Sequence, residues 1–212
     1  MSPAEFVRAH TVIATAPLIP EIRLHLATEI TPIWQATETW LAQAGIAPPF
    51  WAFAWPGAQA LARRVLDEPG AVRGRSVLDF AAGGGLAAIA CAMAGGRTEA
   101  SEVDPLAIAA IDANAALNGT PVMTLSGDIV GAPGRWDLIM CGDVCYEAPM
   151  TQHILPWLRT LAREAEVWIA DPGRAYMPQE GLETLATYEV ATTLELEDRT
   201  ARTTTIFRLQ PG

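Results

Sequence analysis

The pattern of apolar and polar positions is centred on a short strand, a turn of small residues and an apolar helix. Continuous apolar character over Ser76–Phe80, with a carboxylate near its end at Asp79, predicts a buried parallel strand. Small residues fill positions 81–85, and the Ala-rich stretch over 86–94 predicts a helix. Such a turn lets a ligand lie directly on the backbone, next to the N-terminus of the helix.

Strands and helices alternate on both sides of this unit. Before it, the pattern predicts a capped helix beginning at Ser2, a strand exposed on one face over 21–26, and helices over 31–44 and 58–67. After it, the pattern predicts strands over 98–104, 122–125, 136–141 and 167–170, and helices over 105–118 and 151–163. Pro156 should kink the last of these helices or mark an early boundary.

The C-terminal part is predicted to hold a helix over 179–187 and then an antiparallel pair of strands over 188–194 and 202–209. The whole order predicts an α/β fold, a doubly wound sheet with a terminal antiparallel hairpin. We expect residues 1–48 to form a short N-terminal extension (helix, strand, helix) packed on one domain over 49–212, a length that buries a sizeable core.

The spacing of small residues in the central turn separates several kinds of nucleotide site. A dinucleotide fingerprint requires G-x-G-x-x-G, whereas this chain has Asp79-x-Ala81-x-Gly83-x-Gly85. An acid at the strand end repels a pyrophosphate but suits a ligand that carries an ammonium and a sulfonium. A P-loop is excluded because no Gly-Lys-Ser/Thr follows. The stretch resembles class I S-adenosylmethionine (SAM) methyltransferases, and the alternative is a tight turn that binds nothing.

Two further acids follow predicted strands. Glu102 lies about 20 residues past the glycine turn, where a parallel α/β nucleotide site places an acid on ribose hydroxyls. Asp104 faces the other way on an extended chain, so Glu102 is the better candidate. Asp128 follows the next strand; in this class an acid there can accept the adenine amino group, and a turn aspartate is the equal alternative.

Two more segments predict pocket residues. Asp143 and Tyr146 follow the strongly apolar strand over 136–141, at the carboxyl edge where open α/β sheets keep their chemistry. This pair can hold a lysine amine by charge and hydrogen bonding, and apolar surroundings help that amine lose a proton. The aromatic, Pro-rich segment over 49–57 is either a core plug at the sheet edge or a wall of the cofactor pocket, with Trp55 beside the cofactor.

Composition limits the partners. A net charge of −10 and a pI near 4.7 argue against a nucleic-acid backbone and favour a basic partner such as a lysine-rich protein segment, although solubility explains the charge equally well. No apolar run reaches transmembrane length and no signal peptide is evident, so we expect a cytoplasmic protein. The cysteines and histidines are scattered, without zinc-type spacing, and predict no metal site.

With these residues located, the chain from about residue 20 onward resembles the lysine methyltransferases that modify the β-subunit of electron transfer flavoprotein. The resemblance rests on the following segments: Phe50-Trp51-Ala52 with Trp55-Pro56-Gly57, Val77-Leu78-Asp79, Asp104-Pro105, Trp136-Asp137-Leu138, Gly142-Asp143-x-x-Tyr146 and Asp171-Pro172-Gly173-Arg174. The Asp-x-x-Tyr element is shared with related seven-strand protein lysine methyltransferases and is more specific than the glycine turn.

The resemblance implies a seven-strand class I methyltransferase fold and roles for particular residues. Contacts with SAM are implied for Trp55, Asp79, Ala81, Gly83, Gly85 and Glu102, with S-adenosylhomocysteine as the product. Asp143 and Tyr146 are implied to hold the target lysine. The chain departs from the commoner G-x-G-x-G at Ala81, and we expect binding to survive because alanine is small.

Other functions stay open on the sequence alone. On the same scaffold, the acceptor is alternatively a small molecule or a lysine of a ribosomal protein. A non-catalytic nucleotide-binding interaction module is the alternative outside enzymes, and the acids at the strand ends argue against it. A NAD-dependent dehydrogenase is disfavoured by the glycine spacing. A monomer is the default expectation, and Arg174 is assigned to orienting the substrate or pairing with an acid.

Overall fold

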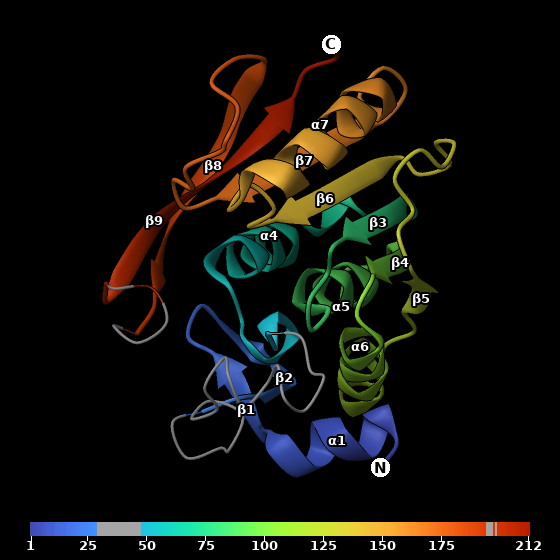
Figure 1. Cartoon of the computed structure of the whole chain (residues 1–212), viewed down its shortest axis with the longest axis vertical. Coiled ribbons are helices and arrows are strands. Elements are labelled where there is room, and N and C mark those ends of the chain that lie inside the picture. The colour runs from blue at the N-terminus through green and yellow to red at the C-terminus, as the bar shows by residue number, and fades with distance from the viewer. Residues whose placement is uncertain (29–47, 194–196, 198) are drawn as a thin grey trace.

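The computed structural model describes residues 1–28, 48–193, 197 and 199–212 (Figure 1). The helix predicted over 31–44 therefore lies outside the described residues, as does Leu194 at the end of a predicted strand. Within the described residues, no helix combines the length and the apolar character that crossing a membrane requires.

A seven-stranded sheet forms the centre of the molecule, in the order β5-β4-β3-β6-β7-β9-β8. The strands are β3 (Ser76–Phe80), β4 (Arg97–Glu102), β5 (Met123–Ser126), β6 (Leu138–Gly142), β7 (Glu166–Asp171), β8 (Leu182–Ala191) and β9 (Ala201–Leu209). The first five are parallel, and β9 runs antiparallel to both β7 and β8. The order reverses between β3 and β6, which is the switch point where open α/β sheets bind ligands beyond the carboxyl ends of their strands.

Helices cover both faces of the sheet (Figure 1). They are α4 (Pro56–Asp67), α5 (Leu86–Met93), α6 (Pro105–Asn118) and α7 (Ala148–Leu161). Successive residues of a strand point to opposite faces. Val77 accordingly packs in one core cluster with α4 and α5, and Leu78 packs in a second cluster with α7. The apolar strands predicted from the sequence are buried on both faces, as a parallel sheet requires.

The N-terminal residues form a small unit of their own. Helix α1 (Pro3–His10) begins with a capping box between Ser2 and Glu5, and β1 (Val12–Ala16) pairs antiparallel with β2 (Ile19–Leu26). The Ala27 N–H donates to the Ala52 carbonyl at 2.8 Å, which joins the end of β2 to the 3₁₀ turn η1 (Phe50–Ala52). A second 3₁₀ turn, η2 (Pro69–Ala71), follows α4.

The predicted helix over 179–187 is wrong, because these residues begin strand β8 at Leu182. The apolar and polar positions there fit a helical period, but pairing with β9 satisfies the backbone through register partners such as Leu182 with Leu209 and Tyr188 with Thr204. Gly181 precedes the strand with a φ of 71°, a left-handed turn that suits glycine. Pro156 lies inside α7, which continues to Leu161.

Candidate active site

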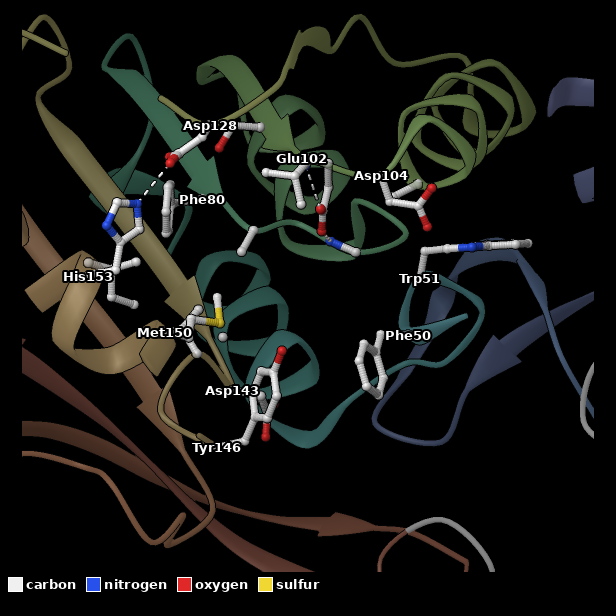
Figure 2. A pocket seen from close by; sticks show the side chains of 18 of the residues that line it. Phe50, Trp51, Phe80, Glu102, Asp104, Asp128, Asp143, Tyr146, Met150 and His153 are labelled. Atoms are coloured by element: carbon white, nitrogen blue, oxygen red, sulfur yellow. Dashed lines mark hydrogen bonds and ion pairs between the residues drawn. The ribbon is translucent and has the colours of Figure 1, made fainter. Parts of the chain in front are cut away.

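A cavity of about 830 Å³ opens at the carboxyl ends of β3, β4, β5 and β6. Seven of the nine residues predicted for the site line it: Trp55, Ala81, Gly83, Glu102, Asp128, Asp143 and Tyr146. In the view of Figure 2, Glu102 and Asp128 lie along one side, and Asp143 and Tyr146 lie along the other. The structure thus brings five of the seven predicted cofactor residues and both predicted substrate residues into one pocket.

The residues of the glycine turn divide into two groups. Ala81 and Gly83 line the pocket in the left-handed region, with φ of 54° and 57°. Gly85 instead caps α5 with a φ of 79°, and a Cβ there would lie 3.1 Å from the Ile111 side chain. A Cβ on Gly84 would lie 2.8 Å from the Trp51 carbonyl oxygen. Two of the three glycines are therefore required by packing behind the pocket.

Asp79 also lies outside the lining in the described part of the chain. Its carboxylate is buried and accepts a hydrogen bond from the Ala88 N–H at 2.8 Å, inside the first turn of α5. Burial raises the pKa of Asp79 to about 7, although that hydrogen bond opposes the shift. The carboxylate therefore positions the start of α5, which follows the turn. Its effect on the pocket is indirect, because it fixes the helix and does not line the pocket itself.

Glu102 holds the glycine turn in place. Its carboxylate accepts hydrogen bonds from the Gly83 N–H at 2.7 Å and from the Val103 N–H at 3.0 Å. Burial raises the pKa of Glu102, and these hydrogen bonds oppose the shift. The neighbouring Asp104 caps α6 by accepting from the Leu106 N–H at 2.8 Å, and it lines the pocket as well.

Asp128 meets a histidine that the sequence did not single out. One oxygen of Asp128 accepts from the Val130 N–H at 2.9 Å, and the other lies 2.8 Å from Nε2 of His153 on α7 (Figure 2). The Val130 hydrogen bond and then His153 lower the pKa of Asp128. The residues are 25 positions apart, so no sequence spacing links them.

Asp143 is the most constrained carboxylate of the pocket. Its backbone has a φ of 56° and only 8% of the residue is exposed. One carboxylate oxygen accepts from the Gly57 N–H at 2.5 Å, and the other accepts from Nε and Nη2 of Arg174 at 3.1 and 2.7 Å. Burial raises the pKa of Asp143 to about 6, against the attraction of Arg174 and the Gly57 hydrogen bond.

Aromatic side chains form the wall opposite the glycine turn. Tyr146 is 42% exposed, and its ring centroid lies 5.8 Å from that of Phe50. The Trp55 indole N–H donates to the Phe50 carbonyl at 2.8 Å, and the two rings meet edge to face at 6.0 Å. The aromatic segment is therefore both a structural plug, with Trp51 buried, and a wall of the pocket.

The lining fits a nucleoside that bears a positive charge. Carboxylates are spread along the pocket at Glu102, Asp104, Asp128, Asp143 and Glu147. The pocket is also lined by apolar side chains that pack in one core cluster: Phe80, Ile129, Val130, Met150 and Ile154. The left-handed small residues of the turn leave their backbone open to a ligand. These features suit SAM, which combines an adenosine with a sulfonium and an ammonium.

Sequence comparison finds similar proteins along nearly the whole chain. The electron transfer flavoprotein beta subunit lysine methyltransferase of Xenopus laevis is 36% identical over 99% of this chain and 87% of the relative. The protein of that name in Homo sapiens is 34% identical over 94% of this chain and 79% of the relative. A Caenorhabditis elegans homolog is 27% identical over 81% of this chain and 77% of the relative. No protein-family model matches the chain.

Structural comparison supports the fold. A putative RNA methyltransferase from Pyrococcus horikoshii superposes with a TM-score of 0.58 at 17% identity, over 78% of this chain and 89% of that chain. Magnesium protoporphyrin IX methyltransferase from Synechocystis, crystallised with SAM, superposes with a TM-score of 0.55 at 21% identity, over 72% and 79% of the two chains. The seven-strand methyltransferase fold predicted from the sequence is confirmed.

Proposed function

The chain belongs to the electron transfer flavoprotein beta subunit lysine methyltransferases, and from this membership we propose that it transfers methyl groups from SAM to lysine side chains of the electron transfer flavoprotein beta subunit. The observation that carries the proposal is the 36% identity with such an enzyme over 99% of this chain. The pocket supports it, because Asp143 and Tyr146 share one cavity with Glu102 and Asp128.

We assign the cofactor end of the pocket to the residues around the glycine turn. Glu102 is proposed to bind the ribose hydroxyls and Asp128 the adenine amino group, with the backbone of Ala81 and Gly83 against the cofactor and Trp55 as a wall. Asp79 and Gly85 support this surface from behind, through the first turn of α5.

When bound, SAM supplies an electrophilic methyl group to a neutral amine and leaves as S-adenosylhomocysteine. The Asp143 carboxylate and the Tyr146 hydroxyl are proposed to orient that amine, and the rings of Phe50 and Trp55 exclude water from it. Such a displacement needs no strong acid or nucleophile from the protein. Positioning and desolvation therefore carry most of the acceleration.

The proposal extends to the surroundings of the enzyme. With a net charge of −10, the surface suits a basic protein segment and repels nucleic acid. We propose a cytoplasmic monomer that acts independently of membranes. Residues 1–48 are proposed to be an N-terminal extension of the domain over 49–212. Its described part is joined to that domain by the hydrogen bond from the Ala27 N–H to the Ala52 carbonyl.

The test incubates the protein with tritiated SAM and purified electron transfer flavoprotein, and the labelled subunits are resolved on a gel. We expect label on the beta subunit, carried by lysine after hydrolysis. Label on a small molecule or on a ribosomal protein, with the beta subunit unlabelled, would contradict the proposed substrate. Isothermal titration with SAM and with NAD separates a methyltransferase from a dehydrogenase, and we expect heat from SAM alone.

Two variants connect the label to the pocket. Tyr146→Phe removes one hydroxyl from a half-exposed ring and leaves its packing on Phe50, so we expect an intact fold, unchanged SAM affinity and a reduced rate. Asp143→Asn is expected to lose activity as well. An amide cannot accept from both Gly57 and Arg174 as a carboxylate does, so its circular dichroism is compared with that of the wild type. Full turnover in both variants would remove the pair from the site.

A further inference from the structure

Arg174 joins two buried carboxylates beside the pocket. Its guanidinium donates to Asp143 through Nε and Nη2 at 3.1 and 2.7 Å, and to Glu197 through Nη1 and Nη2 at 3.0 and 2.5 Å. Arg202 of β9 in turn donates to Glu197 through Nε at 3.0 Å. The four side chains form a chain of alternating charges that starts at the pocket and has no net charge.

The placement of Arg174 is fixed by the turn after β7. One oxygen of Asp171 accepts from the Gly173 and Arg174 N–H groups at 2.7 and 2.6 Å, which closes the turn. The guanidinium carbon lies 5.8 Å from the centre of the Trp55 ring. Glu197 is 4% exposed, so its charge is held away from solvent and acts on Arg174 at close range. Arg174 is therefore held in one position between its two partners.

A lysine that accepts a methyl group must first lose its proton. A buried carboxylate without a counter-charge would bind the ammonium tightly and raise the lysine pKa, which works against this step. A carboxylate already paired with a guanidinium keeps its ability to accept a hydrogen bond but attracts a second cation less strongly.

We propose that Arg174 is a positioning residue that aims the Asp143 carboxylate and neutralises it, so that the target lysine reacts as a free amine. The inference rests on the proposed lysine methylation. Glu197 acts in the opposite direction, because its negative charge offsets part of the positive charge that Arg174 presents to Asp143. The balance between the two sets the pH above which the enzyme works.

Other charged and titratable groups surround this network, and each is retained in the variants below. They are Asp171 at the end of β7, Arg202 on β9, and Cys145, Tyr146 and Glu147 after β6. Because they are the same in every variant, a difference between variants reports on the residue exchanged.

The test measures kcat against pH at saturating SAM and substrate for Arg174→Gln and Glu197→Gln. Removing the cation is expected to move the acidic limb of the profile upward by about 1 unit or more, and removing the anion is expected to move it downward. Near neutral pH, the kcat of Arg174→Gln is then expected to fall at least tenfold. Arg174→Lys keeps the positive charge but cannot make the bidentate hydrogen bond, so it is expected to recover part of the lost kcat. A uniform loss at every pH in both variants would overturn the proposal.

Arg75→Gln is the matched control. Like Arg174, Arg75 donates to a partly buried carboxylate, that of Glu166 at 2.6 Å. It also donates to the Asp137 carbonyl at 2.7 Å, and it lies at the amino end of β3, away from the pocket. Its loss is expected to lower stability and to leave the acidic limb of the profile in place.

A second measurement is independent of methyl transfer. The carboxyl ¹³C resonance of Asp143 is titrated in the cofactor-free protein, where Arg174→Gln should raise its midpoint and Glu197→Gln should lower it. Unchanged midpoints would overturn the proposal even if the enzyme is active. If the wild type labels no lysine but the midpoints move as expected, the proposed function fails and the electrostatic role of Arg174 stands. Should Arg174→Gln not fold, Arg174→Lys and Glu197→Gln carry both tests.

Discussion

The side-chain amide of Asn114 joins the glycine turn to the N-terminal sheet. Its Nδ2 donates to the Gly84 carbonyl at 2.9 Å, and its Oδ1 accepts from the His25 N–H at 2.7 Å. Asn114 is fully buried on α6, and the two backbone groups that it bonds are partly buried. A residue of the cofactor turn and a residue of β2 are thus held by one amide.

We expect Asn114→Ala to lower the free energy of unfolding by about 1–3 kcal/mol, because two partly buried backbone groups lose their partner. The turn should also loosen and weaken SAM binding roughly tenfold, which corresponds to about 1.4 kcal/mol. Asn118→Ala is the control, since Asn118 bonds the N–H and carbonyl of Arg23 on β2 at 3.0 and 2.7 Å. Among the described residues it makes no bond to the turn. Equal SAM affinities of the two variants in calorimetry would contradict the link.

Gly57 stands where a side chain has no room. A Cβ there would lie 2.5 Å from an Asp143 carboxylate oxygen, 2.6 Å from the Ala170 carbonyl oxygen and 2.7 Å from the Asp143 nitrogen. We expect Gly57→Ala to cost about 1–3 kcal/mol of stability and to displace Asp143, with a loss of kcat. Gly70→Ala is the control, because a Cβ at Gly70 would meet no atom of the described residues within 4 Å. Denaturant unfolding and initial rates are measured for both variants. Equal stability and equal kcat in the two would contradict the prediction.

Ala81 carries a left-handed backbone, with a φ of 54°, in a turn where glycine is commoner. An L-residue in this region costs about 1–2 kcal/mol, part of which is offset because glycine is more flexible in the unfolded chain. Ala81→Gly should therefore raise the melting temperature slightly and leave SAM affinity close to that of the wild type. A lower melting temperature would show that the Cβ of Ala81 contributes packing that outweighs the strain.

Asp79 should make stability depend on pH. Its pKa rises from an ordinary value of 3.8 to about 7 on folding, so between these values the folded state binds the proton more strongly than the unfolded state. The free energy of unfolding contributed by this group is therefore highest below pH 4, falls as the pH rises, and levels off above pH 7. Asp79→Asn should lack this fall, which is on the order of a few kcal/mol.

Urea unfolding at pH 4.5, 6 and 8 measures the effect. We expect the stability of Asp79→Asn relative to the wild type to increase steadily across this series. The other carboxylates titrate in both proteins, so they cancel in the difference. A difference that stays constant with pH would show that Asp79 is ionised throughout the range.

The sequence predicted the parts of the fold that depend on local pattern. Three strands could be recognised from their continuous apolar sequence: residues 76–80, β6 and β7. Strands that are buried on both faces show no alternation of polar and apolar residues. The prediction for residues 179–187 was wrong because the spacing of their apolar residues fits a helix. They form a strand from Leu182 onward because they pair with β9, which lies about 20 residues further along the chain. Such pairing is absent from any local window.

The site divides in the same way. Glu102 and Asp143 follow strands, so the carboxyl edge of the sheet places them in the pocket. Asp79 is predicted to contact SAM from the turn motif and the family resemblance, and in the structure its carboxylate accepts from the Ala88 N–H. The bond of Arg174 to Asp143 spans 31 residues, and that of His153 to Asp128 spans 25. Spacing along the chain carries no information about either pair.

The position of β9 between β7 and β8 has a consequence for the synthesis of the protein. The strand with the highest residue numbers lies inside the sheet, and β8, which leaves the ribosome earlier, pairs with β9 among the described strands. Until residues 201–209 emerge, β7 presents an open edge and β8 has no neighbour to pair with. Exposed edges of this kind invite pairing with other chains. The nascent chain is therefore exposed to such pairing until residues 201–209 have left the ribosome and joined β7 to β8.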